Sequence, residues 1–216
     1  LADGSGREMG ILMSACDSAG KDGFTSNAYA FWRKLRKQPE LRHYAEKFIL
    51  LKGASSAEAP RFAIRFPDTE RKDRKAKARG EIPVGFIGTL IQKDKVFGMI
   101  TNDDSDGRVV FPEGLNRNYY QEILAETRTK DKWENPKRLR NETFDLLTYA
   151  ISLILHKKIN YEKIDWLKPK AWAEEWDFNE LVIDLSGDDY EYSAEEDEKE
   201  VQKPTFALQN LGALLA

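Results

Sequence analysis

The sequence has little of what builds cross-linked or zinc-stabilised proteins. Among its 216 residues there is one cysteine, Cys16, and there are two histidines, His43 and His156. A single cysteine cannot form an internal disulfide, and one cysteine with two histidines falls short of the four ligands of a conventional zinc site. We therefore expect any metal bound by this chain to be held by oxygen ligands.

Long apolar runs are absent as well. No stretch approaches the roughly 20 residues of a bilayer-spanning helix, and residues 1–10 lack the apolar centre of a secretory signal. With 41% hydrophobic and 33% charged residues, the chain is predicted to be a soluble, intracellular protein with one substantial core and no membrane contact. The chain starts at Leu1 rather than at a methionine, so we expect it to be part of a longer protein.

Two functional signatures are missing from the sequence. There is no Gly-x-x-x-x-Gly-Lys-Ser/Thr loop, so ATP hydrolysis is not expected of this chain. Nothing resembles a recognition helix or a zinc finger, so we expect any DNA binding to involve little reading of the base sequence.

Charge is unevenly distributed along the chain. The net charge is −3, but residues 184–200 alone contribute −8, which leaves +5 for the remainder. The densest basic segment covers residues 65–79 and suits a phosphate backbone; its candidate DNA contacts are Arg71, Lys72, Arg74 and Lys75. The alternative is a solvated surface loop.

Apolar patterning predicts an α/β protein. Short, nearly uninterrupted apolar runs indicate buried strands at residues 10–16, 48–51 and 82–88, and a shorter strand is expected at 108–111. Helical spacing indicates a helix capped by Thr25 or Ser26, and further helices at residues 92–100, 117–127 and 141–155. The first strand ends in Asp17 and a flexible turn, which gives a strand-turn-helix unit.

The helix predicted at residues 141–155 has two different faces. A wide apolar face should lie against the sheet, and it consists of Phe144, Leu147, Ile151, Ile154 and Leu155. A polar stripe on the same helix contains Asp145 together with Asn141, Glu142, Thr148, Tyr149 and Ser152.

Asp17 at a strand end and Asp145 on a packed helix are carboxylates of the kind that hold divalent cations. Two such cations about 4 Å apart can orient a water, neutralise a phosphate and stabilise the leaving oxygen in phosphodiester hydrolysis. The alternative is structural: Asp17 caps a turn and Asp145 forms a salt bridge with Arg138 or Arg140. Spacing alone leaves both interpretations open.

Several short segments between about residues 10 and 155 occur in an order typical of one protein family. Asp17-Ser18-Ala19-Gly20 comes first, followed by Thr25 and the helix residues 28–33. The next segments are residues 51–55, Ile87-Gly88-Thr89 with Lys93, Phe111-Pro112, Leu124-Ala125-Glu126, and finally residues 140–145 leading to Tyr149-Ala150. Together they resemble the carboxy-terminal nuclease region of lambda-type phage terminase large subunits.

The resemblance implies an α/β fold of the RNase H-like kind over residues 1–165, a mixed sheet flanked by helices. It implies an endonuclease that cuts concatemeric viral double-stranded DNA during packaging with Mg²⁺ or Mn²⁺ in a two-metal site. Asp17 would be the acid of a middle strand and Asp145 the acid of a late helix, both catalytic and metal-binding.

Further site residues follow by position. Glu142, beside Asp145 on the polar stripe, is a candidate metal residue, and its alternative is to face an arginine. Lys52 and Lys93 are candidate contacts to DNA phosphates, and the alternative for Lys93 is a solvated side chain.

The sequence departs from the family pattern in two places. No strand carrying the family's first acid is predicted before Gly10, where Asp3 and Glu8 lie in polar, glycine-rich sequence. Leu90 stands where relatives carry an acid after Gly-Thr. We therefore expect the sheet to lack its first strands in this chain, together with one metal ligand.

Residues 166–216 are predicted to form a tryptophan-containing extension, an acidic linker and a short apolar tail. The resemblance implies that this tail docks on the portal protein, that the terminase small subunit is a further partner, and that the protein acts in the host cytoplasm during virion assembly. The alternative for the tail is a disordered end.

Two other functions stay open on the sequence. The missing acid also fits a fragment that docks on DNA or on the portal without cutting. The strand-loop-helix around Asp17 to Thr25 suggests, more distantly, an unrelated nucleotide-binding α/β enzyme, although the phosphate-binding glycine pattern is lacking.

Overall fold

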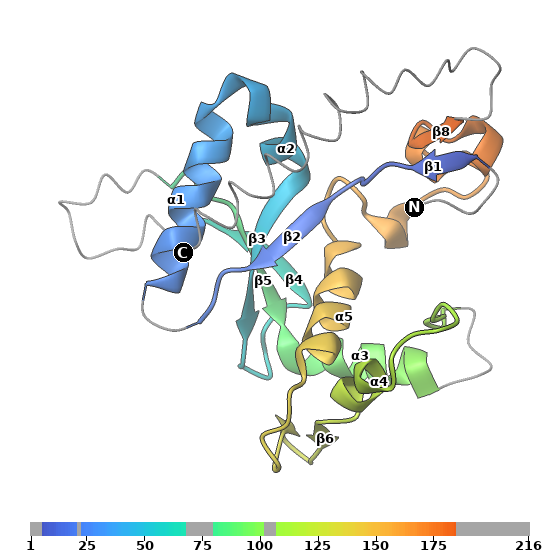
Figure 1. The fold of residues 1–216 in the computed structure, drawn as a ribbon. Coiled ribbons are helices and arrows are strands. Elements are labelled where there is room, and N and C mark those ends of the chain that lie inside the picture. Colours follow the sequence, from blue (N-terminus) through green and yellow to red (C-terminus); the bar gives the residue numbers. More distant parts are fainter. Residues whose placement is uncertain (1–5, 21–22, 68–79, 102–106, 185–216) are drawn as a thin grey trace. The chain divides into compact units, whose positions relative to one another are not determined.

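The computed structural model describes residues 6–20, 23–67, 80–101 and 107–184. Their contacts divide them into two units, both drawn in Figure 1. The sheet unit consists of Ala15–Ala19 and Ile49–Lys163, and the terminal unit contains the described parts of Leu1–Ser14, Gly20–Phe48 and Ile164–Ala216. The predicted DNA contacts Arg71, Lys72, Arg74 and Lys75 lie outside the described residues, as do most of the acidic linker and the whole apolar tail.

A four-stranded mixed sheet, in the order β2-β3-β5-β4, is the base of the sheet unit. Its strands are β2 (Ser14–Asp17), β3 (Phe48–Ala54), β4 (Phe62–Arg65) and β5 (Val84–Gly88). β3 and β5 run parallel, with Leu51 opposite Gly85, and β4 runs antiparallel to β5, with Ile64 opposite Gly85. The two central strands match the predicted apolar runs, because strands with a neighbour on each side bury continuous apolar sequence.

The edge strand β2 differs from the prediction of a buried strand over residues 10–16. It contains only Ser14–Asp17, its first two residues are exposed, and Cys16 and Asp17 are half-buried. Because β2 ends the sheet, it has a neighbouring strand on one side only, which leaves its small residues accessible.

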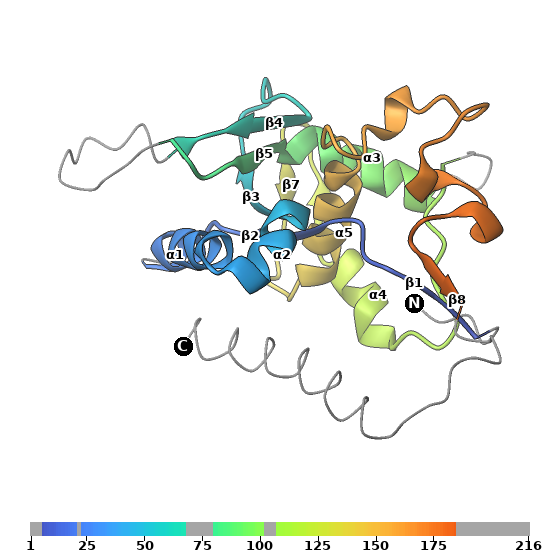
Figure 2. The ribbon, with the colours of Figure 1, turned by 90° about the horizontal axis from the view of Figure 1, so that it is seen from above.

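Three helices of the sheet unit pack together, as Figures 1 and 2 show: α3 (Thr89–Thr101), α4 (Arg117–Ile123) and α5 (Glu142–Leu153). α5 packs against both α3 and α4. Each helix gives one buried side chain to the centre of their core, namely Val96, Ile123 and Phe144. The apolar face of α5 therefore packs mainly on two helices, and the prediction that it lies against the sheet is wrong in this respect.

Two further predictions in this region are corrected. The helix predicted to reach residue 127 ends at Ile123, because the chain turns there and enters a short hairpin of β6 (Thr127–Arg128) and β7 (Trp133–Glu134). Residues 108–111 form no strand; the Val109 amide instead donates to the carbonyl of Met99, at the end of α3.

The terminal unit holds a helical segment and a small two-stranded sheet. The helices are α1 (Phe24–Lys37), the 3-10 turn η1 (Pro39–Leu41) and α2 (Arg42–Lys47). α1 begins after Gly23, which takes a left-handed conformation with φ 88°, so the predicted cap at Thr25 or Ser26 is wrong. Within the part of the chain that the structure describes, no helix is both long and apolar enough to cross a membrane.

A short strand occurs before Gly10, but it does not belong to the mixed sheet, so it is not the family's first strand, which the sequence predicts to be missing. It is β1 (Arg7–Met9), and it pairs antiparallel with β8 (Val182–Asp184) in the terminal unit rather than with the mixed sheet. The tryptophan-containing extension forms short 3-10 turns, Ala171–Ala173 and Trp176–Phe178, and the Arg7 guanidinium lies 4.9 Å from the Trp176 ring centre.

Candidate active site

Asp17 is held at the end of β2 by the two residues that follow it. Ser18 is fully buried, and its amide and hydroxyl each donate to the carbonyl oxygen of Leu51 on β3 at 2.8 Å. The Asp17 Oδ1 atom accepts the Ala19 amide, also at 2.8 Å. Asp17 therefore caps a turn, as the structural interpretation expects, and this turn fixes its carboxylate in place.

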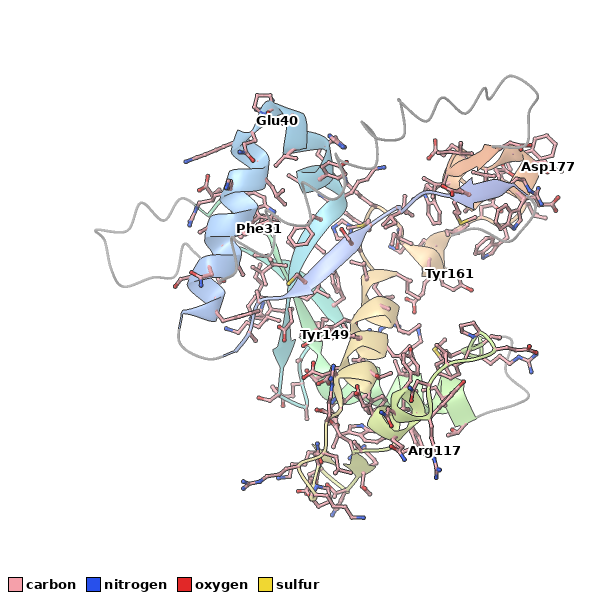
Figure 3. The ribbon with its side chains drawn as sticks, viewed as in Figure 1. Phe31, Glu40, Arg117, Tyr149, Tyr161 and Asp177 are labelled. Carbon is pink, nitrogen blue, oxygen red and sulfur yellow. The ribbon has the colours of Figure 1, made fainter. Side chains whose placement is uncertain are left out.

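Tyr149 connects Asp17 to helix α5. Its hydroxyl donates a hydrogen bond to the Asp17 side chain. The pKa of Tyr149 is raised, mainly by burial, then by the negative charges of Asp17 and Asp145, and least by Glu142. Because both aspartates act on one phenol, they lie in one neighbourhood of the sheet unit; Figure 3 labels Tyr149 there.

A buried charged cluster supports Asp145. The Lys93 Nζ atom lies 2.8 and 2.7 Å from the two carboxylate oxygens of Glu126, and 2.7 Å from Asp145 Oδ1. The side chains of Lys93 and Glu126 are 6% and 7% exposed, whereas that of Asp145 is 33% exposed. Asp145 is thus the member of the cluster that faces solvent, while its two partners are enclosed by protein.

Asn141 completes this cluster from the start of α5. Its side-chain amide donates to Glu126 Oε1 and, at 3.3 Å, to Asp145 Oδ2. Both oxygens of Asp145 therefore have a donor, Lys93 on one and Asn141 on the other. Donors of this kind fix the orientation of a carboxylate before any ligand arrives.

Glu122 on α4 anchors the beginning of α5. Its Oε2 atom accepts the amide and the hydroxyl of Thr143 at 3.1 and 2.8 Å, and its Oε1 atom lies 3.0 Å from the Arg140 Nε atom. Arg140 thus pairs with Glu122, and Asp145 pairs with Lys93. The alternative in which Asp145 forms a salt bridge with Arg140 or Arg138 is not what the structure has.

The polar stripe of α5 divides into two parts with different roles. Thr148 and Ser152 are fully buried and donate to backbone carbonyls one turn earlier, Phe144 and Thr148 respectively. Ser152 also accepts the side-chain amide of Gln92 at 2.9 Å. These two residues are satisfied within the helical core, so the part of the stripe that is left for the site consists of Asn141, Glu142, Asp145 and Tyr149.

The other predicted site residues are placed as follows. Glu142 is exposed at the first position of α5, and Lys52 is half-buried on β3, directly after the residue that binds Ser18. Lys93 is enclosed by Glu126 and Asp145, so the alternative of a solvated lysine is wrong.

Glu126 belongs to the candidate site but was not predicted as a site residue from the spacing of polar and apolar residues. It follows the end of α4 and belongs to no periodic face, although it lies in one of the segments that resemble the terminase family. A usable signal was Lys93 itself: a lysine on an apolar helix beside buried Gln92 and Val96 needs a carboxylate partner.

The donor set of the site suits some metals better than others. In residues 6–20, 23–67, 80–101 and 107–184, no three His, Cys, Asp or Glu side chains come close enough together to hold a metal ion. The charges of Asp17 and Asp145 raise the pKa of Tyr149 more than the charge of Glu142 does. Mg²⁺ is commonly bound through one or two carboxylates with water and phosphate oxygens as its other ligands, so Asp17 and Asp145 are the side chains that would hold Mg²⁺ or the chemically similar Mn²⁺.

Comparison with known proteins gives one finding. The model of a protein family described as terminase large subunit gpA, endonuclease domain, matches residues 1–166. This range includes Asp17, Lys93, Glu126, Asn141 and Asp145. No curated protein and no solved structure was matched.

Proposed function

The chain belongs to the family of terminase large subunit gpA endonuclease domains, and from this membership we propose that it is a metal-dependent endonuclease acting in viral DNA packaging. Its substrate would be concatemeric double-stranded DNA, cut in the host cytoplasm during virion assembly. The observation that carries the proposal is the position of Tyr149, which lies one helical turn beyond Asp145 on α5 and bonds the Asp17 side chain. Acids from a strand end and from a helix are thereby brought to one partly exposed place.

We propose an RNase H-like arrangement for this site, with Asp17 and Asp145 as the metal-holding catalytic acids and Glu142 as a third carboxylate. When bound, Mg²⁺ or Mn²⁺ would supply the positive charge that neutralises the scissile phosphate and activates water. The contribution of the chain is preorganisation. Ser18 and Ala19 fix the turn that carries Asp17, and Lys93 and Asn141 hold the two oxygens of Asp145.

Partners follow from the packaging role and are part of the same proposal. Lys52 on β3 and the basic segment at residues 65–79 would contact DNA phosphates, and the terminase small subunit and the portal protein would be protein partners. The main role of Lys93 would be to orient Asp145 rather than to contact a DNA phosphate, because its ammonium is already bound by two carboxylates.

The test is cleavage of a supercoiled plasmid by the full chain with Mg²⁺ or Mn²⁺. Asp17→Asn and Asp145→Asn should each lower the rate by at least about 100-fold, more than the roughly 10–100-fold typical of a residue that only supports a metal ligand. Glu113→Gln is the matched control, since it neutralises an exposed carboxylate that is not among the proposed site residues, and it should leave the rate unchanged. Cleavage that survives both aspartate substitutions would contradict the assignment of these acids.

A second candidate is a fragment that docks on DNA or on the portal without cutting. The observation in its favour is that the described part of the chain lacks a cluster of three metal-binding side chains. A folded wild-type chain that binds DNA but leaves the plasmid intact with either metal would support this candidate.

A further inference from the structure

Between Glu126 and Asn141 the chain leaves the site in an excursion of 14 residues, 127–140, which we call the basic arm. It contains two acidic residues, Asp131 and Glu134, and six basic residues, so its net charge is +4. The basic residues are Arg128, Lys130, Lys132, Lys137, Arg138 and Arg140. Figure 3 shows nitrogen-tipped side chains pointing outward around β6, at the beginning of this arm.

Both ends of the basic arm are fastened at the candidate active site. Glu126 immediately precedes the arm and Asn141 immediately follows it. The Asn141 amide donates to Glu126, which closes the arm at its base, and the same amide donates to Asp145. The arm therefore begins and ends beside the acid that we propose as catalytic.

The first half of the arm is a hairpin anchored to α3. Thr127 pairs with Glu134, and both the amide and the hydroxyl of Thr129 donate to the carbonyl of Lys132, at 2.9 and 2.8 Å. The indole N–H of Trp133 donates to Asp94 on α3 at 2.7 Å. The Trp133 ring also packs edge-to-face on Phe144, with 5.1 Å between ring centres, so the hairpin is attached to the helical core.

The second half of the arm is a turn closed by Asn135. The side-chain amide of Asn135 donates to the Leu139 carbonyl, and its Oδ1 atom accepts the Leu139 amide at 2.9 Å. The Arg138 amide donates to the Asn135 carbonyl at 3.1 Å, and Arg138 takes a left-handed backbone conformation with φ 50°. The turn thus presents Lys137 and Arg138 at an exposed, conformationally fixed position.

The six cations of the arm fall into two groups. Arg128 pairs with Asp94, Lys132 with Glu134, and Arg140 with Glu122. The other three, Lys130, Lys137 and Arg138, are exposed and make no ion pair with any residue that the structure describes. Exposed cations without an ion-pair partner attract a regular polyanion, and the binding is strengthened by release of its counterions.

We propose that the basic arm binds the phosphate backbone of double-stranded DNA next to Asp145, through Lys130, Lys137 and Arg138. The choice of DNA as the partner rests on the proposed nuclease function, whereas the surface itself is separate from the acids. Contacts of this type position a duplex without reading its sequence.

The test compares three full-length proteins in binding to a fluorescent 30-base-pair duplex over a range of salt concentrations, with EDTA present. The arm variant carries Lys130→Gln, Lys137→Gln and Arg138→Asn, because asparagine tolerates the left-handed backbone at that position. The control variant carries Lys157→Gln, Lys163→Gln and Lys168→Gln, which remove the same charge from exposed positions beyond the carboxyl end of α5.

The arm variant should bind at least about 10-fold more weakly at low salt, and the slope of log K against log salt should fall by about 2–3, since each phosphate contact contributes roughly 0.9. The control variant should change affinity by less than about twofold. Thermal unfolding checks that each variant is folded. If the arm variant is unfolded, the single variants Lys130→Gln and Lys137→Gln replace it, and each should lower the slope by about 0.9.

Equal affinity and slope for the arm variant and the control would overturn the proposal, as would a wild-type chain that does not bind the duplex. If the wild type cuts plasmid and the arm variant binds the duplex normally, the nuclease function is supported and the proposal that the basic arm binds DNA is contradicted. Arm-dependent binding by a wild type that cuts nothing with Mg²⁺ or Mn²⁺ would support the arm and contradict the nuclease.

Discussion

The ammonium of Lys93 lies 2.7 Å from Asp145 Oδ1 while both oxygens of Glu126 bind the same nitrogen. One buried cation therefore serves two carboxylates, one enclosed and one that reaches solvent. Removing one partner of such a cluster leaves an uncompensated buried charge, which costs far more than the net value of the pair.

Lys93→Met should lower the free energy of unfolding by about 3–5 kcal/mol, because Glu126 would then be buried without a cation. Urea denaturation measures this loss. The double variant Lys93→Met, Glu126→Gln should be destabilised by less than the sum of the two single variants, with a coupling of at least about 1 kcal/mol. A single Lys93→Met variant within about 0.5 kcal/mol of the wild type would show that the cluster is not buried as described.

Tyr149→Phe should lower plasmid cleavage by about 10-fold, since it removes a donor that orients the Asp17 carboxylate. Tyr120→Phe removes a phenol on α4 and should leave cleavage unchanged. If both variants cut like the wild type, the Tyr149 hydroxyl does not orient Asp17 for catalysis.

The raised pKa of Tyr149 also predicts a pH effect on stability. The unfolded chain loses this phenolic proton near the ordinary tyrosine pKa of about 10, while the folded chain keeps it to higher pH. The stabilisation is present below pH 10 and is lost as the pH rises towards the pKa of the folded state. Denaturation between pH 8 and 11 should show a steeper decline for the wild type than for Tyr149→Phe, and parallel curves would contradict the assignment.

His156 should make the sheet unit less stable in mild acid. Its pKa is lowered below the ordinary 6.5, first by burial and then by the charges of Lys158 and Lys157. Its Nδ1 atom accepts the Lys158 amide at 3.3 Å, an interaction that requires the neutral ring. The unfolded state therefore binds a proton more readily than the folded state below pH 6.5, so stability falls as the pH falls.

The measurement for His156 is the slope of unfolding free energy against pH between about 5 and 7, compared with His156→Asn. The asparagine variant keeps a side-chain acceptor but cannot titrate, so its slope should be smaller whatever its absolute stability. The Phe62 ring packs edge-to-face on His156, with ring centres 6.1 Å apart. Because the variant loses this contact, its free energy of unfolding should be lower at every pH. Identical slopes would mean that His156 does not titrate differently in the folded state.

The central strands could be predicted from sequence because burial on both sides demands a continuous apolar run. Leu50, Leu51, Val84 and Ile87 are fully buried where such runs occur. The run at residues 10–16 looks similar, yet β2 is short and lies at the sheet edge. Strand order depends on pairing between distant segments, and local composition does not contain that information.

The helix α5 and its polar stripe were predictable from helical spacing, but the roles along the stripe were not. Thr148 and Ser152 look as polar as Asn141 in sequence, and they are satisfied by backbone carbonyls inside the core. Glu126 contacts Lys93 although the two are 33 positions apart in sequence, and helical or strand spacing cannot predict a contact at that separation. Asp17 and Asp145 could be predicted as catalytic acids only because an ordered family resemblance added to their spacing, and this assignment stays a prediction.

The single side-chain amide of Asn141 has two acceptors, Glu126 at the start of the basic arm and Asp145 within α5. The arm cannot swing away from its base without that amide giving up one of them. The arm and the aspartate are consequently coupled mechanically, because a force on one is transmitted to the other through one planar group. Asn141→Ala would remove this amide link without removing a charge, and Lys93 would remain as the second link between Glu126 and Asp145.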